Sequence, residues 1–331
     1  METNNLTAHI GNTPLLRLKQ ASELTGCNIY GKAEYFNPGE SVKDRAALYI
    51  INDAIKKKKI QKGGTIVEGT AGNTGIGLAI VCKFYDLNLK IVIPKTQSAE
   101  KKETLKKLGA ELIEVDAVPF SNPNNYIKKS KKIADELSKE NKNGVYWANQ
   151  FDNIVNARAH IETTAEEIWT QTAGKIDAFI CAVGTGGTLS GVSVGLKKKS
   201  KNIKIALADP LGSSLYSYIK NKELISTGSS ITEGIGTARI TKNFEKALID
   251  DAFQVDDNEA LNIVFGLIES QKIVLGGSSG VNIGGAIKLA RKMGPGHNIV
   301  TILCDTGYRY ASKIFNKNFL KEKNLPIPKW L

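Results

Sequence analysis

One lysine lies in a setting that could give it a chemical role. Lys43 belongs to the stretch NPGESVKDR (37–45), whose first three residues interrupt the segment before it. Ser41 and Asp44 then have the S-x-x-D spacing of a helix start. Lys43 is therefore predicted in the first turn of a helix, where the positive end of the helix dipole and the neighbouring Arg45 disfavour a charged ammonium. An uncharged lysine can attack an aldehyde and act as a base afterwards.

Two glycine-rich turns further along the chain could bind anions. The turn EGTAGNTGIG (68–77) and the turn VGTGGTLSG (183–191) each follow a strand-like run and open a helix, so that free N–H groups face a ligand. The donors of the first turn are Thr70, Asn73 and Thr74, and those of the second are Gly184, Thr185, Gly186, Gly187 and Thr188. Neither turn is a dinucleotide fingerprint or a P-loop, and each alone could be only a tight packing turn. With Lys43, however, two anion sites match a phosphorylated aldehyde cofactor that holds an amino acid.

A third stretch, GGSSG (276–280), opens another helix with two hydroxyl groups. One interpretation is a serine N-cap. The other is a hydroxyl partner for the pyridine nitrogen of the cofactor, where pyridoxal enzymes commonly place a carboxylate or an arginine. A neutral hydroxyl does not hold that nitrogen protonated, and the weaker electron sink that results suits β-elimination more than transamination.

Strand-like and helix-like segments alternate along the chain. The repeated βα units predict an α/β fold of two domains with mainly parallel, helix-covered sheets. The predicted strands are 29–34, 65–68, 89–94, 111–115, 145–147, 178–183, 203–208 and 299–303. The predicted helices are 42–58, 73–85, 99–108, 124–140, 154–172, 189–199, 258–270 and 280–293. In such folds ligands bind beyond the carboxyl ends of strands, where the two glycine-rich turns lie.

The composition of the 331 residues is that of an ordinary globular protein, with no apolar run of membrane-spanning length. The N-terminal residues do not have the pattern of a secretory signal. Four widely spaced cysteines and three histidines without ligand spacing predict neither a disulfide framework nor a metal site, and they suit a reducing cytosol. Cys181 and Cys304 are expected as buried thiols. The net charge of +12 comes mostly from lysines on helical segments, so nucleic-acid binding is not expected.

These motifs together resemble the cysteine synthases (O-acetylserine sulfhydrylases) of the β-family, or fold type II, of pyridoxal-phosphate enzymes, which have the tryptophan synthase β-like fold. The resemblance runs almost from end to end, beginning with GNTPLLRL (11–18), and NPGESVKDR is its most specific motif. It implies that Lys43 forms the Schiff base with pyridoxal 5'-phosphate. It implies that the substrate carboxylate is bound by Thr70, Gly72, Asn73, Thr74 and Gln150, with Asn73 also near the cofactor.

The remaining assignments also come from the resemblance. The phosphate cradle would consist of Gly184, Thr185, Gly186, Gly187 and Thr188. Ser278 would be the partner of the ring nitrogen, with Ser279 as the adjacent alternative, and Gly234 would lie in a loop near the mouth of the site. The larger, cofactor-binding domain would comprise residues 1–45 and 155–331, and residues 46–154 would form a smaller, mobile domain that carries the substrate loop.

The resemblance implies a PLP-dependent β-replacement that makes L-cysteine from O-acetyl-L-serine and sulfide. Lys43 would remove the Cα proton, acetate would leave to give an α-aminoacrylate, and sulfide would add before Lys43 returns the proton. A cytoplasmic homodimer is expected, and a serine acetyltransferase is a possible partner. Asp305, after the last strong strand, is placed where a polar group could reach the site, although helix capping is the role expected for it.

Two departures from the family pattern leave alternatives open. Ala71 stands where many members have a serine, and Glu233 is more typical of cystathionine β-synthases. Cystathionine synthesis from serine and homocysteine, or the use of O-phosphoserine, therefore stays possible. An enzyme for phosphoserine would need an extra basic group at the pocket mouth, which the sequence alone does not place. A non-catalytic relative that binds a regulatory partner is the alternative from a different class, although Lys43, Asn73, Gln150 and Ser278 are all present.

Overall fold

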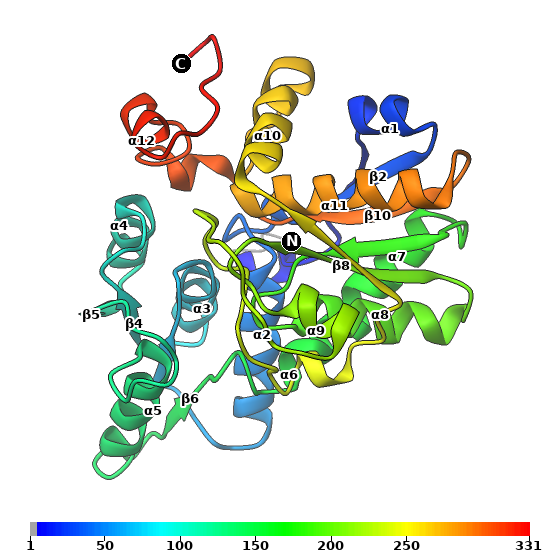
Figure 1. Cartoon of the computed structure of the whole chain (residues 1–331). Coiled ribbons are helices and arrows are strands. Elements are labelled where there is room, and N and C mark those ends of the chain that lie inside the picture. Colours follow the sequence, from blue (N-terminus) through cyan, green and yellow to red (C-terminus); the bar gives the residue numbers. More distant parts are fainter. Residues whose placement is uncertain (1–4) are drawn as a thin grey trace.

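The computed structural model describes residues 5–331, and the first four residues of the predicted larger domain lie outside it. The predicted α/β fold with two mainly parallel sheets is confirmed (Figure 1). The larger sheet has the strand order β1-β2-β10-β7-β8-β9, and only β1 is antiparallel to its neighbour. Its strands are β1 (Leu15–Arg17), β2 (Asn28–Ala33), β7 (Ala178–Cys181), β8 (Lys204–Pro210), β9 (Asp251–Val255) and β10 (Asn298–Leu303).

The smaller sheet is parallel throughout and has the order β5-β4-β3-β6. Its strands are β3 (Thr65–Gly69), β4 (Asn88–Pro94), β5 (Glu111–Val115) and β6 (Val145–Trp147). The helices around it are α2 (Lys43–Lys56), α3 (Asn73–Phe84), α4 (Ala99–Lys107) and α5 (Tyr126–Leu137). All four strands lie within the segment 46–154 that was predicted as the smaller domain. The mobility of that segment stays a prediction.

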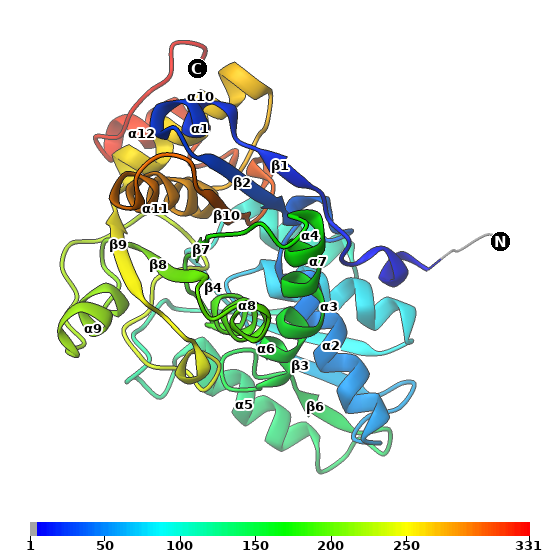
Figure 2. The same ribbon diagram turned by 90° about the vertical axis from the view of Figure 1, so that its right-hand side faces the viewer.

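The helices of the larger sheet cover both of its faces (Figure 2). One face carries α1 (Lys19–Thr25), α10 (Asp257–Gln271) and α11 (Gly277–Met293). The other carries α6 (Val155–Ala159), α7 (Ala165–Gln171), α8 (Gly187–Lys199) and α9 (Leu215–Asn221). The short helix α12 (Lys317–Glu322) lies near the C-terminus. No helix among residues 5–331 is long and apolar enough to cross a membrane.

The predicted alternation of strands and helices is present, with differences at the edges. The strands β1 and β9 and the helices α1, α9 and α12 were not predicted, because their short runs have too few residues to show a period. The predicted helix 154–172 consists of α6, a π-helical turn (His160–Thr164) and α7. The helices α8 and α11 begin two and three residues earlier than predicted, because their starts consist of glycines and small polar residues.

A buried ion network joins the start of α2 to the larger sheet. Arg45 donates from Nε to Glu34 Oε2 at 2.7 Å and from Nη1 to Glu167 Oε1 at 2.6 Å, while Lys32 Nζ lies 2.5 Å from Glu167 Oε2. Burial raises the pKa of Glu167, but bonds from Arg45 and Lys32 outweigh it and lower that pKa to about 2. The Arg45 guanidinium is therefore paired with two carboxylates, and its expected influence on Lys43 stays a prediction.

We predict that Arg45→Met lowers the free energy of unfolding by about 3–5 kcal/mol, because it leaves the fully buried Glu34 without its ion-pair partner and leaves Glu167 with Lys32 alone. The matched control is Arg158→Met, since Arg158 is half-exposed and pairs with Asp53. Asp53 keeps its second partner Lys57 in this variant, so the half-exposed Arg158 should contribute no more than about 1 kcal/mol. Urea unfolding of both variants, followed by circular dichroism, measures the difference, and equal losses would contradict the prediction.

Candidate active site

A cavity of about 700 Å³ lies between the two sheets and contains Lys43 in its wall. The smaller-sheet side supplies the loop Thr70 to Thr74, and the larger-sheet side supplies Gly184, Thr185 and residues 232–239. Gln150 and Ser278 also line the cavity. The first glycine-rich turn thus meets Gly184 and Thr185 of the second turn in one cavity, although the turns come from different sheets. Gly186 and Thr188 line the adjoining pocket, which also contains Lys43, and Gly187 lines neither. No group of three or more His, Cys, Asp or Glu residues within residues 5–331 could hold a metal ion.

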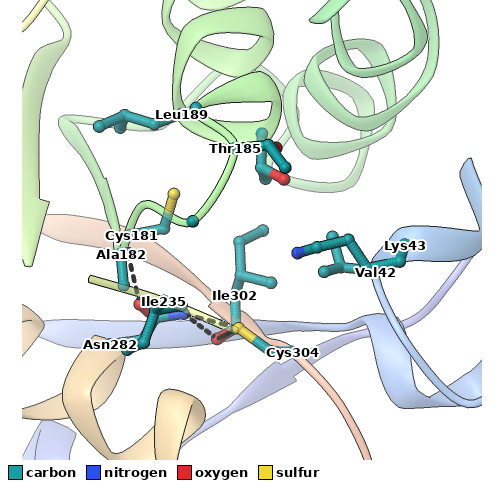
Figure 3. Close-up of a pocket in the computed structure, with 13 residues that line it drawn as sticks. Val42, Lys43, Cys181, Ala182, Thr185, Leu189, Ile235, Asn282, Ile302 and Cys304 are labelled. Atoms are coloured by element: carbon teal, nitrogen blue, oxygen red, sulfur yellow. Dashed lines mark hydrogen bonds between the residues drawn. The ribbon is translucent and has the colours of Figure 1, made fainter. Parts of the chain in front are cut away.

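Lys43 lies in the first turn of α2, as its sequence setting predicts, although the helix begins at Lys43 rather than Val42 and no side chain caps it. The Ser41 hydroxyl accepts a hydrogen bond from the Lys43 N–H at 3.3 Å, and the Asp44 carboxylate accepts one from the Gly39 N–H. These contacts fix the helix start. Figure 3 shows the Lys43 side chain extended from α2 into the cavity. Its Nζ has no ion pair or hydrogen bond to any residue between 5 and 331, so the amine is free to react.

Below Lys43, the wall of the cavity is held together by the buried side-chain amide of Asn282 (Figure 3). Asn282 Oδ1 accepts from the Ala182 N–H at 2.6 Å, and its Nδ2 donates to the Ile302 carbonyl at 2.7 Å. Cys304 follows β10 and lines the cavity, where part of the residue is exposed, whereas Cys181 is fully buried, so the expectation of a buried thiol is confirmed in full only for Cys181. Burial raises the pKa of Cys304 to about 11, so it stays a thiol.

The second glycine-rich turn has the backbone shape of an anion cradle. Gly186 has φ +86°, a left-handed conformation that side chains avoid. A Cβ atom at Gly187 would lie 2.1 Å from Asn156 Oδ1, and one at Gly184 would lie 2.1 Å from the carbonyl oxygen of Gly234. Only glycine fits at these positions. The helix α8 begins inside this turn, at Gly187, whose N–H donates to Thr185 Oγ1 at 3.3 Å; the free N–H groups of a helix start favour an anion at this place.

Two threonine hydroxyls flank this cradle. Thr185 Oγ1 accepts from Asn156 Nδ2 at 3.0 Å and can still donate its own proton. Thr188 Oγ1 lies 3.2 Å from Nε2 of His160, whose Nδ1 lies 2.9 Å from Thr164 Oγ1. Burial, with a smaller contribution from the Arg45 charge, lowers the pKa of His160 to about 3. His160 is therefore neutral and joins the π-helical turn to the cradle.

The first glycine-rich turn is held by its own hydroxyls. Thr70 Oγ1 accepts from the Gly72 N–H at 3.1 Å, and Gly72 has φ +131°. Thr74 Oγ1 donates to Gln150 Oε1 at 2.6 Å, which places both side chains in one wall of the cavity. Glu68, at the end of β3, is buried, and burial raises its pKa to about 8.

Asn73 is held from the opposite side of the cavity. Its Nδ2 donates to Asp305 Oδ2 at 2.6 Å, and its Oδ1 accepts from Arg309 Nη1 at 3.1 Å. The interpretation of Asp305 as a helix cap is wrong. The following 3-10 turn (Gly307–Tyr310) is capped by Thr306, whose hydroxyl accepts from the Tyr308 N–H, and the Asp305 carboxylate is left to bind side chains.

Neither serine of the GGSSG stretch (276–280) is the N-cap of the helix that follows. The N-cap of α11 is Gly276, and no side chain caps it. Ser279 is fully buried, and its hydroxyl accepts from the Cys304 N–H at 2.9 Å. Ser278 is the serine that lines the cavity, so it is the better placed of the two for a ligand.

Three further cavity or near-cavity residues were not predicted from the sequence: Lys101, Arg239 and Tyr310. Lys101 is one of four lysines in α4 and is buried, and burial lowers its pKa. It pairs with Glu233 at 2.6 Å. No local pattern separates Lys101 from the solvated lysines beside it. The burial of Lys101 could have been predicted only with knowledge of its contact with Glu233 of the larger unit.

Residues 6–305 match the family model described as pyridoxal-phosphate dependent enzyme. The chain belongs to this family. A cysteine synthase 1 of Neurospora crassa is 50% identical over 325 residues, which cover 97% of this chain and 85% of the relative. A cysteine synthase 1 of Emericella nidulans is also 50% identical, over 99% of this chain and 89% of the relative. The structure of an O-acetylserine dependent cystathionine beta-synthase from Helicobacter pylori has 33% identity and a TM-score of 0.84, and covers 95% of this chain and 98% of that one.

The chemistry of the donor groups fits pyridoxal 5'-phosphate. The cofactor offers an aldehyde, a phosphate and a ring nitrogen. The cavity offers the free amine of Lys43, the cradle at the start of α8 and the Ser278 hydroxyl. Each group of the cofactor thus has a partner of suitable chemistry within one cavity.

We predict that His160 makes folding stability depend on pH. The unfolded chain takes up a proton at His160 near the ordinary pKa of 6.5, whereas the folded protein stays neutral there down to about pH 3. Stability should therefore fall as the pH drops below 6.5. In His160→Gln the melting temperature should decline less between pH 7.5 and 5 than in the wild type. The exposed His9 supplies the control His9→Gln, and parallel declines in all three proteins would refute the assignment.

Proposed function

We propose that this protein makes L-cysteine and acetate from O-acetyl-L-serine and sulfide. One observation carries the proposal: the unpaired amine of Lys43 lies in a cavity that has an anion-binding helix start on each side, at α3 and at α8. One start suits the carboxylate of an amino acid and the other suits a phosphate. The names of the Neurospora and Emericella relatives support the same activity.

In this proposal Lys43 holds the cofactor, with Gly184, Thr185, Gly186, Gly187 and Thr188 around its phosphate and Ser278 at its ring nitrogen. When bound, pyridoxal phosphate supplies an electron sink for the charge left at Cα. The hydroxyl of Ser278 is neutral and does not protonate the ring nitrogen. This moderate electron sink favours loss of a β-substituent over transamination.

The substrate carboxylate is bound by the first glycine-rich turn. Thr70, Gly72, Asn73 and Thr74 surround it, and Gln150 is aligned by its bond to Thr74. Gly234 lies at the mouth, where its loop contacts the cradle. Closure of the turn over the substrate excludes water from the cavity and protects the reacting group from hydrolysis.

The amine of Lys43 moves the proton. Once the substrate has displaced it, Nζ takes the proton from Cα, and the Cβ–O bond breaks to release acetate. Sulfide then forms the Cβ–S bond, and Nζ returns the proton to Cα. Acetate leaves with the electron pair of the Cβ–O bond and sulfide supplies the pair for the Cβ–S bond, so the replacement needs no external redox partner, and the amine ends the cycle in the protonation state in which it began.

Further parts of the proposal come from the resemblance. The smaller unit, residues 46–154, moves against the rest of the chain, and two copies form a homodimer. A serine acetyltransferase is a possible partner, and the location is cytoplasmic. The four cysteines, all free thiols in the structure, support a reducing compartment.

We predict that Lys43→Ala lowers the turnover of O-acetylserine and sulfide by at least about 10³-fold, because the variant lacks the group that moves the proton. The matched control is Lys56→Ala, at the exposed end of the same helix, which should be unaffected. The wild-type protein loaded with cofactor should change its visible absorption on addition of O-acetylserine and regain it on addition of sulfide, as cysteine forms. A spectrum that ignores O-acetylserine but responds to serine or phosphoserine would overturn the substrate assignment.

A second candidate substrate is O-phospho-L-serine, and Arg239 favours it. Its guanidinium lies against the rings of Phe120 and Phe151, with Cζ 4.2 and 5.2 Å from their centroids, and lines the cavity. Its only side-chain bond within residues 5–331 is a long one of 3.3 Å from Nη1 to Asp152, and Nη2 is buried without a partner. Arg239 thus supports the phosphoserine candidate as the extra basic group that such an enzyme would need.

Arg239→Leu separates these two substrates, because it keeps an apolar stem between the rings and removes the charge. If phosphoserine is used, the ratio of its kcat/KM to that of O-acetylserine should fall by about tenfold or more in the variant. Steady-state assays with both donors and with serine, each with sulfide and with homocysteine, give this ratio and also test cystathionine synthesis. An unchanged ratio, together with a wild-type preference for O-acetylserine, would eliminate the phosphoserine candidate.

A further inference from the structure

A line of hydrogen bonds joins the two sheets beside the cavity. Lys101 Nζ contacts Glu233 Oε2 at 2.6 Å and Tyr310 Oη at 3.0 Å. Tyr310 Oη then donates to Asp305 Oδ2 at 2.6 Å, and that same oxygen accepts from Asn73 Nδ2 at 2.6 Å. These five residues are called the cross-sheet network below. Asn73 and Lys101 belong to the smaller unit, and the other three belong to the larger one.

The directions of these hydrogen bonds are set by chemistry. An ammonium group can only donate, so the Tyr310 hydroxyl accepts from Lys101 and must use its own proton toward Asp305. Asp305 accepts at Oδ2 from both Tyr310 and Asn73. Its second oxygen, Oδ1, is buried without a partner among residues 5–331. The position of this carboxylate therefore depends on Tyr310 and Asn73.

The amide of Asn73 can adopt only one orientation in this arrangement. The Asp305 carboxylate takes one N–H, and Arg309 donates to the carbonyl oxygen, so exchange of the two ends of the amide would place like groups against each other. Arg309 is itself held by the carbonyl oxygen of Gly39 at 2.6 Å. One N–H of Asn73 is left over, on a side chain that lines the cavity.

The backbone of the 70–74 turn packs against Lys101 of the cross-sheet network. A Cβ atom at Gly72 would lie 2.7 Å from Cδ of Lys101, so the lysine stem contacts the turn directly. Lys101 is 1% exposed, Asp305 1% and Tyr310 4%. Hydrogen bonds between groups this deeply buried are strong, and the loss of one partner is costly.

We propose that Asp305 and Tyr310 are positioning residues for substrate binding, which act through Asn73 and hold the 70–74 turn against the larger sheet. The inference rests on the proposed function, because it takes Asn73 as a donor to the carboxylate of an amino acid. Neither residue moves a proton in the reaction. Their loss weakens the binding of the amino acid and leaves the chemistry of sulfide addition intact.

The test compares Tyr310→Phe and Asp305→Asn with the wild type, all loaded with pyridoxal phosphate. The control Tyr308→Phe removes a hydroxyl from the same 3-10 turn, where Tyr308 is 71% exposed. The dissociation constant of L-alanine, which carries the carboxylate but has no leaving group, is measured from the visible spectrum or by calorimetry. It should rise about tenfold in Tyr310→Phe and in Asp305→Asn and stay unchanged in Tyr308→Phe.

Kinetics and coupling distinguish positioning from simple loss of stability. The KM for O-acetylserine should rise about tenfold with kcat nearly unchanged. The double variant Asn73→Ala/Tyr310→Phe should bind L-alanine no more weakly than Asn73→Ala alone, since Tyr310 acts through Asn73. Additive effects, or a fall in kcat with unchanged KM and unchanged L-alanine affinity, would overturn the proposal. Melting temperatures of the single variants show whether each protein is folded.

The proposed reaction and the network proposal can be refuted separately. If the wild type binds L-alanine but does not turn over O-acetylserine, the proposed reaction is wrong, and the variants still decide the role of the network. If the wild type turns over O-acetylserine and the variants bind L-alanine as tightly as it does, only the network proposal is wrong. A wild type that binds no α-amino acid overturns the network proposal as well.

Discussion

The ion pairs of Arg45 determine where the reactive lysine lies. Arg45 is two residues after Lys43, and its guanidinium is bound by Glu34 at the end of β2 and by Glu167 on α7. Both carboxylates belong to the larger sheet unit. The apolar residues of α2, from Ala46 to Ala54, pack instead into the core of the smaller sheet. The helix is thus bound by charge to one unit and by apolar contact to the other, and Lys43 lies where the two meet.

The remaining site groups reach the same place because of strand direction. The first glycine-rich turn follows β3, the second follows β7, and Asp305 follows β10. Each of these strands ends at the cavity, and the carboxyl ends of parallel strands are the usual position of ligand sites in α/β folds. The turns can be short because the strand ends already point toward the ligand. Buried strands therefore do most of the positioning.

Features that depend on neighbours in the sequence could be predicted. The start of α2 at Lys43, the two glycine-rich turns and the alternation of strands with helices all follow from local spacing. Features that depend on residues far apart in the sequence could not be predicted. Asp305 was interpreted as a helix cap because its partner Asn73 is 232 residues away, and Lys101 resembles every other lysine of its helix. The pairing of Arg45 with carboxylates also needs the fold, since the sequence shows only that it is close to Lys43.

The two helix starts that face the cavity belong to different units, since α3 packs on the smaller sheet and α8 on the larger one. Each carries the partial positive charge of a helix N-terminus, so in the absence of anions the two ends repel each other weakly. A ligand with a negative group at each end would be attracted to both helix starts. It would therefore form an ionic cross-link between the units. Such a ligand would add an ionic link to the contacts that the cross-sheet network already makes between the units, whereas a molecule that carries only one of the two charges would bind to one unit alone.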